Sequence, residues 1–212
     1  MREDLHIILD VDPGVDDAIA IVLALGLGAN VEAITCVNGN TNVKKACDNV
    51  RRVLKLLNKT SIPIYEGSDE PLTGYVDTGD YFGEDAFGNV AWKYGLPDQN
   101  QENTSMNKHA AFLMLEMAKA NRNLYTLVLL GPLTNPAVAL KVDPQFTSYL
   151  KDIFILGGNA YGRGNVLPGA EFNFWVDPEA ADVVLAKAQC PVTIVPWEAS
   201  LDSLLPWVTI EF

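Results

Sequence analysis

Four aspartates, Asp10, Asp12, Asp16 and Asp17, occupy eight positions near the amino terminus and enclose the turn-forming pair Pro13-Gly14. An apolar run precedes them, so we expect a strand, a tight turn and a helix that begins at two carboxylates. The helix dipole and free N–H groups explain one acidic residue at a helix start. Three carboxylates at one strand end repel one another, and a bound divalent cation would remove that repulsion. Oxygen-rich ligand sets of this kind suit calcium or magnesium.

A second polar group lies far along the chain, where Asn165, Glu171 and Asn173 fall within nine residues. Each hydroxyl of a sugar both donates and accepts hydrogen bonds, so two amides and a carboxylate suit a polyol. A polar loop whose side chains cap nearby backbone groups explains the same residues equally well. Taken alone, the pattern leaves both explanations open.

Apolar and β-branched runs alternate with segments of helical period along most of the chain. They predict strands at 7–12, 31–37, 62–65, 125–130, 153–156 and 192–195, and helices at 15–27, 43–57, 107–120, 137–142 and 177–188. Within the first helix, residues 18–27 are almost wholly apolar, which predicts that it is buried. The segments 66–105 and 159–175 are rich in glycine and polar turn residues and are predicted loops.

This alternation predicts an α/β fold, with an open, mostly parallel sheet covered by helices on both faces, in a single domain over residues 1–212. Ligands of such sheets bind at the carboxyl ends of the strands. A polar cluster follows each of four predicted strands, so we expect the four to meet at one edge. These clusters are residues 12–17, 39–40, 131–135 and 157–173.

The composition narrows the class of protein. The 212 residues carry a formal net charge of −12 and no basic cluster, which disfavours nucleic acid and anionic membranes as partners. The longest apolar run, 18–29, is too short to span a bilayer, and the charged amino terminus does not look like a signal peptide. Three cysteines without paired spacing favour reduced thiols, and we expect a cytoplasmic protein.

The sequence Asp-Val-Asp-Pro-Gly-Val-Asp-Asp-Ala at 10–18 resembles the amino-terminal signature of the inosine-uridine-preferring nucleoside hydrolases. Residues 165–173, Asn-Val-Leu-Pro-Gly-Ala-Glu-Phe-Asn, resemble the family's second signature. The resemblance implies a Rossmann-like sheet and hydrolysis of the N-glycosidic bond of purine or pyrimidine ribonucleosides to ribose and free base. It also implies a calcium ion that activates the attacking water, a small-molecule nucleoside as substrate, and a possible homo-oligomer.

Residue roles carry over from the same resemblance. It implies that Asp12 is both a metal ligand and the general base, and that Asp17 and the main-chain carbonyl of Leu130 are further ligands. Asp10 would be structural. The residues implied to contact the substrate, mainly its ribose, are Asp16, Asn40, Leu156, Asn165, Glu171 and Asn173.

The sequence departs from the family toward its carboxyl end. Family members are longer, and their last part supplies an aspartate that completes the metal site and a histidine that helps the leaving base. No histidine follows His109 in this sequence, and His6 and His109 are interpreted as ordinary surface residues. We therefore expect a fold that is truncated at the carboxyl end, and very slow or absent hydrolysis of inosine or uridine by these 212 residues alone.

Two other functions remain open at this stage. The chain could bind ribosides or metal without turnover, as a non-catalytic short form. The pair Asp10 and Asp12 after a strand also resembles the nucleophile motif of haloacid-dehalogenase-like phosphatases, which use magnesium on a parallel sheet. That alternative leaves Asp16, Asp17 and the 165–173 segment unexplained.

Overall fold

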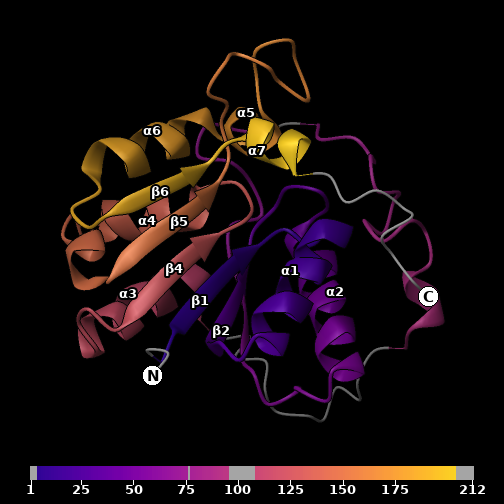
Figure 1. The fold of residues 1–212 in the computed structure, drawn as a ribbon, viewed down its shortest axis with the longest axis horizontal. Coiled ribbons are helices and arrows are strands. Elements are labelled where there is room, and N and C mark those ends of the chain that lie inside the picture. Colours follow the sequence, from indigo (N-terminus) through magenta and orange to yellow (C-terminus); the bar gives the residue numbers. More distant parts are fainter. Residues whose placement is uncertain (1–3, 76, 96–107, 204–212) are drawn as a thin grey trace.

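The computed structural model describes residues 4–75, 77–95 and 108–203. Within them, six strands form one parallel sheet in the order β3-β2-β1-β4-β5-β6 (Figure 1). The strands are β1 (His6–Val11), β2 (Asn30–Cys36), β3 (Ile64–Glu66), β4 (Tyr125–Leu129), β5 (Asp152–Leu156) and β6 (Val192–Val195). The predicted α/β class and parallel sheet are confirmed.

Helices pack on both faces of this sheet. On one face, α3 (Ala110–Ala120), α4 (Thr134–Val142) and α6 (Pro178–Lys187) form a core with residues of β1, β4 and β5. On the other, α1 (Val15–Gly26) and α2 (Val43–Leu56) pack on β1, β2 and β3. Short helices α5 (Phe172–Val176) and α7 (Trp197–Asp202), and 3-10 helices Ala91–Lys93 and Phe146–Tyr149, complete the described elements.

The amino ends of three helices refine the sequence prediction. Residue 107, the predicted start of the third helix, lies outside the described residues, and α3 begins at Ala110. His109 is not an ordinary surface residue, because its Nδ1 accepts a hydrogen bond from the Ala111 N–H (3.2 Å) as the helix cap, and burial lowers its pKa.

α4 begins at Thr134 rather than 137, since Pro136 is tolerated in a first turn. Asp177 caps α6 as predicted, accepting from the Ala180 N–H (3.0 Å).

Four short elements lie where the sequence predicts none. α5 falls inside the predicted 159–175 loop, and the 3-10 helix Ala91–Lys93 falls inside the predicted 66–105 loop. The 3-10 helix Phe146–Tyr149 follows α4, and α7 follows β6. Each has six residues or fewer, which is less than two helical turns. A periodic apolar pattern needs a longer window, so these helices leave no signal in the sequence.

The prediction that the helix at 18–27 is buried is wrong for its outer side. Asp17 and Ile21 are the buried residues of α1, whereas Ile19 is 60% exposed and Leu23 is 56% exposed. The inner side of α1 packs against the sheet and α2, and no other described element covers the outer side. The helix is therefore apolar on sides that the described residues leave open.

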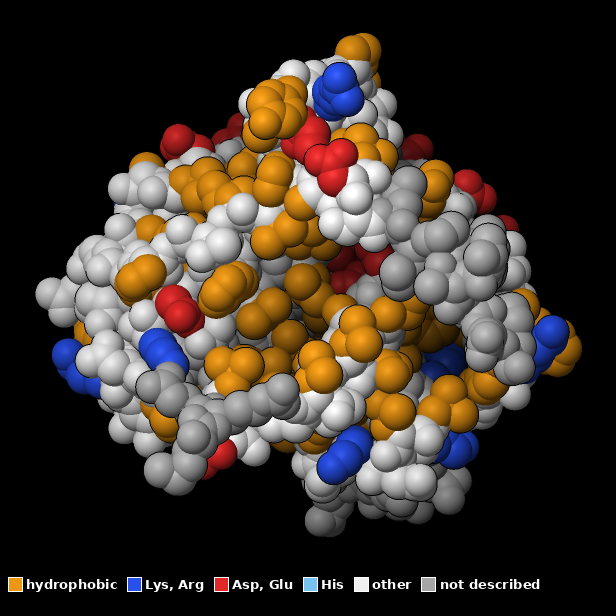
Figure 2. All heavy atoms as spheres, in the orientation of Figure 1, with side chains coloured by type: hydrophobic (Ala, Val, Ile, Leu, Met, Phe, Trp, Pro, Cys, Tyr) orange, Lys and Arg blue, Asp and Glu red, His pale blue; other side chains and the backbone are white. Residues whose placement is uncertain are grey.

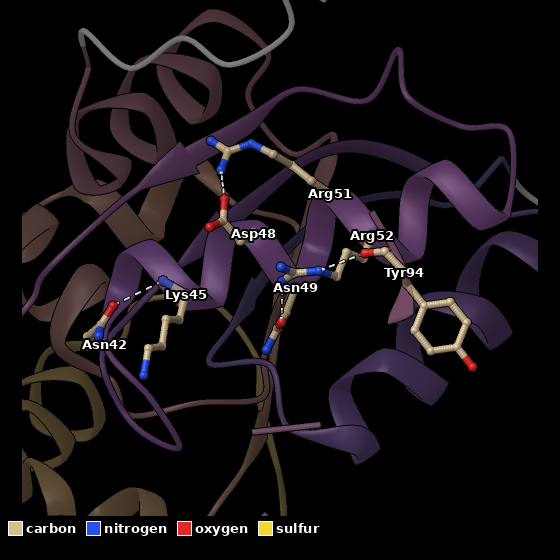
Figure 3. A network of polar contacts seen from close by, with 7 residues as sticks. All are labelled: Asn42, Lys45, Asp48, Asn49, Arg51, Arg52 and Tyr94. Atoms are coloured by element: carbon tan, nitrogen blue, oxygen red, sulfur yellow. Dashed lines mark hydrogen bonds and ion pairs between the residues drawn. The ribbon is translucent and has the colours of Figure 1, made fainter. Parts of the chain in front are cut away.

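The polar side of α2 holds the segment that follows β3, where Figure 3 shows Arg52 reaching Tyr94, and it also holds the turn after β1. The buried amide of Asn49 donates to the carbonyls of Pro13 (3.3 Å) and Asp85 (2.8 Å). Arg52 bridges the Asn49 side chain (3.0 Å) and the Tyr94 carbonyl (3.1 Å). These contacts fix the Pro13 turn, and with it the start of α1.

Asn135, in the first turn of α4, joins four segments at the centre of the molecule. Its Nδ2 donates to Asp10 Oδ1 (2.9 Å) and to the Cys36 carbonyl (3.0 Å), and its Oδ1 accepts from the Ser68 N–H (2.8 Å). A Cβ on Gly67 would lie 2.2 Å from Asn135 Oδ1, so the close approach requires glycine there. One buried amide thus connects β1, β2, α4 and the chain after β3.

The structure also bears on membranes and on thiol chemistry. In the described parts of the chain, no helix combines the length and the apolar character needed to cross a bilayer. Cys36 and Cys47 are buried, Cys190 is half-buried, and all three are free thiols.

Asn135→Ala is expected to lower the free energy of unfolding by about 3 kcal/mol, because it removes the hydrogen bonds to the buried Cys36 carbonyl and Asp10 carboxyl and to the half-buried Ser68 N–H. Urea unfolding followed by circular dichroism measures the change. Asn30→Ala, at an exposed position, is the control and should cost less than about 0.5 kcal/mol. Equal losses in the two variants would contradict the role given to Asn135.

Candidate active site

The polar clusters that follow the strands meet at one edge of the sheet. Beyond the paired strands, the Val37 N–H donates to the Val11 carbonyl (3.0 Å) and the Leu130 N–H donates to the Asp10 carbonyl (2.9 Å). The chain leaving β2 and the chain leaving β4 therefore flank Asp12 on its two sides. The prediction that these strand ends gather at one edge is confirmed for these three strands.

Asp12 is held by two hydrogen bonds from Asn40 and is enclosed by two glycines. The Asn40 N–H donates to its Oδ2 (2.8 Å), and Asn40 Nδ2 donates to its main-chain carbonyl (3.3 Å). A Cβ on Gly39 would lie 2.0 Å from Oδ2, and a Cβ on Gly131 would lie 2.7 Å from Oδ1. Glycines on both sides therefore let two backbone segments enclose a carboxylate that is 1% exposed.

Asp17 lies in the first turn of α1 with its carboxylate turned inward. Its Oδ2 accepts from the Gly14 N–H (3.1 Å), which is the hydrogen bond of an acidic residue near a helix start. Its Oδ1 is buried without a hydrogen-bond partner among the described residues. Asp16, one residue earlier, is exposed. A buried carboxylate oxygen without a donor needs a proton or a cation to satisfy it.

The electric environment of the two buried carboxylates opposes their ionisation. Burial raises the pKa of Asp12 well above its ordinary value, and the charge of Asp17 raises it further. Burial also raises the pKa of Asp17, with Asp16 adding repulsion. The N–H groups of Asn40 and Gly14 counteract only part of this. The pair is thus poorly solvated and self-repelling, and a divalent cation between them would stabilise both charged forms.

Asn173 joins the ends of β4 and β5 beside these carboxylates. Its Nδ2 donates to the main-chain carbonyls of Leu130 (2.7 Å) and Leu156 (2.9 Å). Both amide hydrogens are used, so the Oδ1 atom is the part of this side chain left to accept from a ligand. The Leu130 carbonyl oxygen keeps a second lone pair. Asn173 and Asp12 therefore lie at the same edge of the sheet, as predicted.

Glu171 is buried at the start of α5 and is engaged by backbone donors. Its Oε1 accepts from the Asn173 N–H (2.9 Å), and its Oε2 accepts from the N–H groups of Gly158 (2.8 Å) and Phe174 (3.1 Å). Burial raises its pKa, and these N–H groups limit the rise. Glu171 thus ties the chain after β5 to α5, and so positions Asn173.

Asn165 is placed differently from the other predicted contacts. It is exposed in the loop before α5, and its Oδ1 accepts from the Phe172 N–H (2.8 Å). The loop stands out from the rest of the molecule at the top of Figure 1. No described contact joins Asn165 to Asp12, Asp17 or Asn40, so the geometry supports the capping explanation for this residue.

Glu198 makes a long-range contact near the carboxyl edge that the sequence did not reveal. This buried carboxylate in α7 accepts from the N–H groups of Ala160 (2.9 Å) and Tyr161 (2.8 Å). Although desolvation acts to raise its pKa, these N–H groups outweigh it and leave the pKa below the usual value. Its partners lie nearly forty positions earlier, and no local motif marks such a contact.

The oxygen atoms at this edge suit a hard cation but supply only part of its coordination shell. Asp12, Asp17 and the Leu130 carbonyl supply oxygen atoms at one edge, which calcium and magnesium prefer. Among the residues that the structure describes, no group of three or more histidine, cysteine, aspartate or glutamate side chains is arranged to hold a metal ion. Two carboxylates and a carbonyl therefore fit as part of a coordination shell, with further positions open to water or ligand.

Asp10 does not point into this site. It is fully buried beneath it, where Thr35 Oγ1 donates to its Oδ1 (2.6 Å) beside the Asn135 amide. Burial raises its pKa to about 7, and these two donors limit the rise. A carboxyl enclosed in this way cannot reach a phosphate ester, which removes the basis of the phosphatase alternative. The interpretation of Asp10 as structural agrees with this position.

This protein is thus a parallel α/β sheet with paired carboxylates, amides and a main-chain carbonyl at its carboxyl edge, which is the edge where sheets of this class bind their ligands. The family described as "Inosine-uridine preferring nucleoside hydrolase" matches residues 7–211, and the chain belongs to this family.

Individual relatives agree with this assignment. The chain is 42% identical over 182 residues to the pyrimidine-specific ribonucleoside hydrolase RihA of Escherichia coli O1:K1, covering 85% of this chain and 56% of that protein. It is 37% identical over 192 residues to the probable uridine nucleosidase 1 of Oryza sativa subsp. japonica, covering 88% of this chain and 57% of that protein. The chain thus spans little more than half the length of these curated relatives.

Among solved structures, an inosine-guanosine nucleoside hydrolase superposes with a TM-score of 0.88 at 36% identity. The superposition covers 96% of this chain and 65% of the other. The fold seen here is therefore nearly all shared, and about a third of the relative lies outside it.

Asp10 makes stability depend on pH. Its folded pKa of about 7 exceeds its ordinary value of 3.8, so the folded state retains a proton that the unfolded chain releases. The stabilisation is complete below about pH 4 and is lost as pH rises toward 7, by up to about 4 kcal/mol.

Asp10→Asn keeps the oxygen that accepts from Thr35 and Asn135 but does not titrate, so its unfolding free energy should fall less between pH 4 and pH 8. Urea unfolding in EDTA measures this, with exposed Asp182→Asn as the control. A pH dependence unchanged by Asp10→Asn would contradict the assignment.

Proposed function

We propose that this chain carries the metal- and ribose-binding part of a hydrolase that cleaves the N-glycosidic bond of ribonucleosides, giving ribose and free base. The observation that carries the proposal is the burial of Asp12 and Asp17 together at the carboxyl edge, with Asp17 Oδ1 lacking a partner among the described residues, in a chain of this family. The family is one of metal-dependent hydrolases, and we propose calcium as the ion in this chain, because the family resemblance implies it and the oxygen donors suit it.

The proposed ligands of the calcium ion are the carboxylates of Asp12 and Asp17 and the main-chain carbonyl of Leu130. When bound, the ion would lower the pKa of a water molecule and stabilise the ionised forms of both carboxylates. This role agrees with the raised pKa values of Asp12 and Asp17, because a counter-charge between them would favour the ionised form of each carboxylate.

The proposed reaction is a displacement at the anomeric carbon of the ribose. Asp12 accepts a proton from the attacking water, whose oxygen forms the new bond to carbon. The carbon–nitrogen bond breaks, its electron pair leaves with the base, and the base takes up a proton. Positive charge grows on the sugar ring in between, and buried carboxylates stabilise it. The hydrogen bonds from Asn40 fix Asp12 for this role.

The ribose is proposed to bind among Asp16, Asn40, Leu156, Glu171 and Asn173. Asp16 is exposed at the start of α1 and so is accessible to a sugar hydroxyl. Asn173 offers its Oδ1, while Glu171 has both oxygens engaged by backbone donors but retains lone pairs. Asn165, which the family resemblance implies as a contact, would act by holding α5 in place. The relatives' names include pyrimidine-specific and inosine-guanosine enzymes, so the proposal is limited to ribonucleosides as a class.

Calcium binding can be tested on the chain itself. We expect isothermal titration calorimetry to detect calcium binding at millimolar concentration, weaker than in a site with a further carboxylate, since water must fill the remaining positions. Asp17→Asn should remove most of the heat, and exposed Asp182→Asn should not. Absence of calcium heat in the wild-type chain would count against the site.

Hydrolysis can be tested in a chimera that extends this chain with the part of the E. coli relative outside the match. Asp12→Ala should lower the release of free base from inosine or uridine by about a hundredfold or more, because it removes the proposed base. Asn173→Ala should weaken transition-state binding by about 2–3 kcal/mol.

Chromatography of the released base measures both rates, with Asp182→Ala as the control. Riboside binding without turnover in the unsubstituted chimera would favour the non-catalytic alternative. An unchanged rate in Asp12→Ala would contradict the mechanism.

A further inference from the structure

Glu198, in the first turn of α7, holds the chain that leaves β5. This carboxylate is 6% exposed, and each of its oxygen atoms accepts from a backbone N–H group, Oε2 from Ala160 (2.9 Å) and Oε1 from Tyr161 (2.8 Å). The N–H of its neighbour Trp197 donates to the Gly158 carbonyl (3.0 Å). The first turn of α7 therefore fixes residues 158–161, which we call the exit segment.

Glu171, at the start of α5, holds the same segment from its other end. Its Oε2 accepts from the Gly158 N–H (2.8 Å), so Gly158 is bonded to α5 through its N–H and to α7 through its carbonyl. The Phe174 ring packs closely here, since a Cβ on Gly157 would lie 2.5 Å from the ring and one on Gly158 would lie 3.0 Å from it. The exit segment therefore has little room to move without moving α5.

Asn173 connects the exit segment to the candidate site. Its N–H donates to Glu171 Oε1 (2.9 Å), and its side-chain amide donates to the main-chain carbonyls of Leu130 (2.7 Å) and Leu156 (2.9 Å). Leu156 is the last residue of β5, directly before the glycine pair that Phe174 covers. A continuous series of hydrogen bonds thus leads from α7 to the Leu130 carbonyl, a proposed calcium ligand.

The negative charge of Glu198 is part of this contact. In the part of the chain that the structure describes, neither Glu198 nor Glu171 forms an ion pair, and backbone N–H groups are the donors to both. Hydrogen bonds to an ionised carboxylate are about twice as strong as those between neutral groups. A neutral side chain of the same shape at position 198 should therefore loosen the exit segment without leaving a cavity.

We propose that Glu198 is a positioning residue of the candidate site, which holds the exit segment so that Asn173 keeps the Leu130 carbonyl and its own Oδ1 in place for the ligand. The proposal rests on the proposed function for the identity of that ligand, the calcium ion and the ribose. Its hydrogen bonds go to the exit segment and not to a proposed ligand of the metal or contact of the ribose, so Glu198 acts through other residues. The place of α7 agrees with this role, because Figure 2 shows acidic side chains set back in a hollow below the position that α7 has in Figure 1.

The connection is tested by NMR on the chain itself, without metal or nucleoside. The nitrogen–proton correlation peaks of the Asn173 side-chain amide, assigned by their absence in Asn173→Asp, report its bonds to the Leu130 and Leu156 carbonyls. Glu198→Gln should shift these peaks by more than they vary between preparations of the unsubstituted chain. Asp143→Asn is the control, since this carboxylate also accepts a backbone N–H, from Gln145 (2.9 Å), but lies at the end of α4, and it should leave the peaks unchanged.

The consequence for the ligand is tested by kinetics at saturating calcium, in the chimera that extends this chain with the rest of the E. coli relative. Glu198→Gln should raise the KM for inosine or uridine about tenfold, because the ribose contacts loosen in the ground state and the transition state alike. The kcat should change less than about threefold, since the contacts between Asn40 and Asp12 are untouched. A residue that only stabilised the fold would lower the apparent kcat, through loss of folded enzyme, and leave the KM unchanged.

Unshifted Asn173 peaks in Glu198→Gln would overturn the proposal, as would a fall in kcat with the KM unchanged. Circular dichroism checks that the variant folds. If it does not, Glu198→Asp decides the matter, because it keeps the charge but is one methylene too short to reach both N–H groups, and it should shift the same peaks. The NMR measurement needs neither calcium nor substrate. An inactive chimera therefore counts against the proposed function alone, and unshifted peaks with an active chimera count against this proposal alone.

Discussion

The structure depends on keeping three carboxyl groups, those of Asp10, Asp12 and Asp17, buried at the carboxyl end of one inner strand. Burial raises the pKa of each of them, so each must be protonated, hydrogen-bonded or balanced by a cation. The molecule treats them differently. Asp10 lies beneath the site and accepts two side-chain hydrogen bonds on its Oδ1, while its Oδ2 is buried without a hydrogen-bond partner among the described residues. Asp12 and Asp17 instead accept hydrogen bonds from backbone N–H groups at the sheet edge.

Much of the surrounding architecture follows from this constraint. Two glycines, Gly39 and Gly131, bring the chains after β2 and β4 against Asp12, since a side chain at either would collide with its carboxylate. The Asn135 amide fixes Asp10 and the end of β2 together, and the Asn173 amide fixes the ends of β4 and β5. The sheet edge is thus a framework of amide–carbonyl contacts around a pair of charges.

Sequence reasoning predicted those parts of this arrangement that depend on residues close together in the sequence. Strand and helix periods predicted the parallel sheet, and the aspartate spacing predicted three carboxylates, Asp12, Asp16 and Asp17, at the end of the first strand. Two of them, Asp12 and Asp17, are buried there and Asp16 is exposed, and the choice of this pair came from the family resemblance. Asn135 and Thr35 escaped prediction because their partner, Asp10, lies 125 and 25 residues away. Glu198 escaped for the same reason. The exposed outer side of α1 could not be foreseen, because an apolar sequence predicts burial without saying which segment supplies the cover.

The central claim is that burial disfavours the ionised forms of Asp12 and Asp17 until a divalent cation binds between the two carboxylates. The most direct test is the number of protons released when calcium binds, obtained by calorimetry at pH 7 in two buffers of different ionisation enthalpy. Because burial raises both pKa values and neighbouring carboxylates add to the rise, we expect calcium to displace protons from the pair, with a release that shrinks as pH rises. Calcium binding without proton release at any pH would contradict the account.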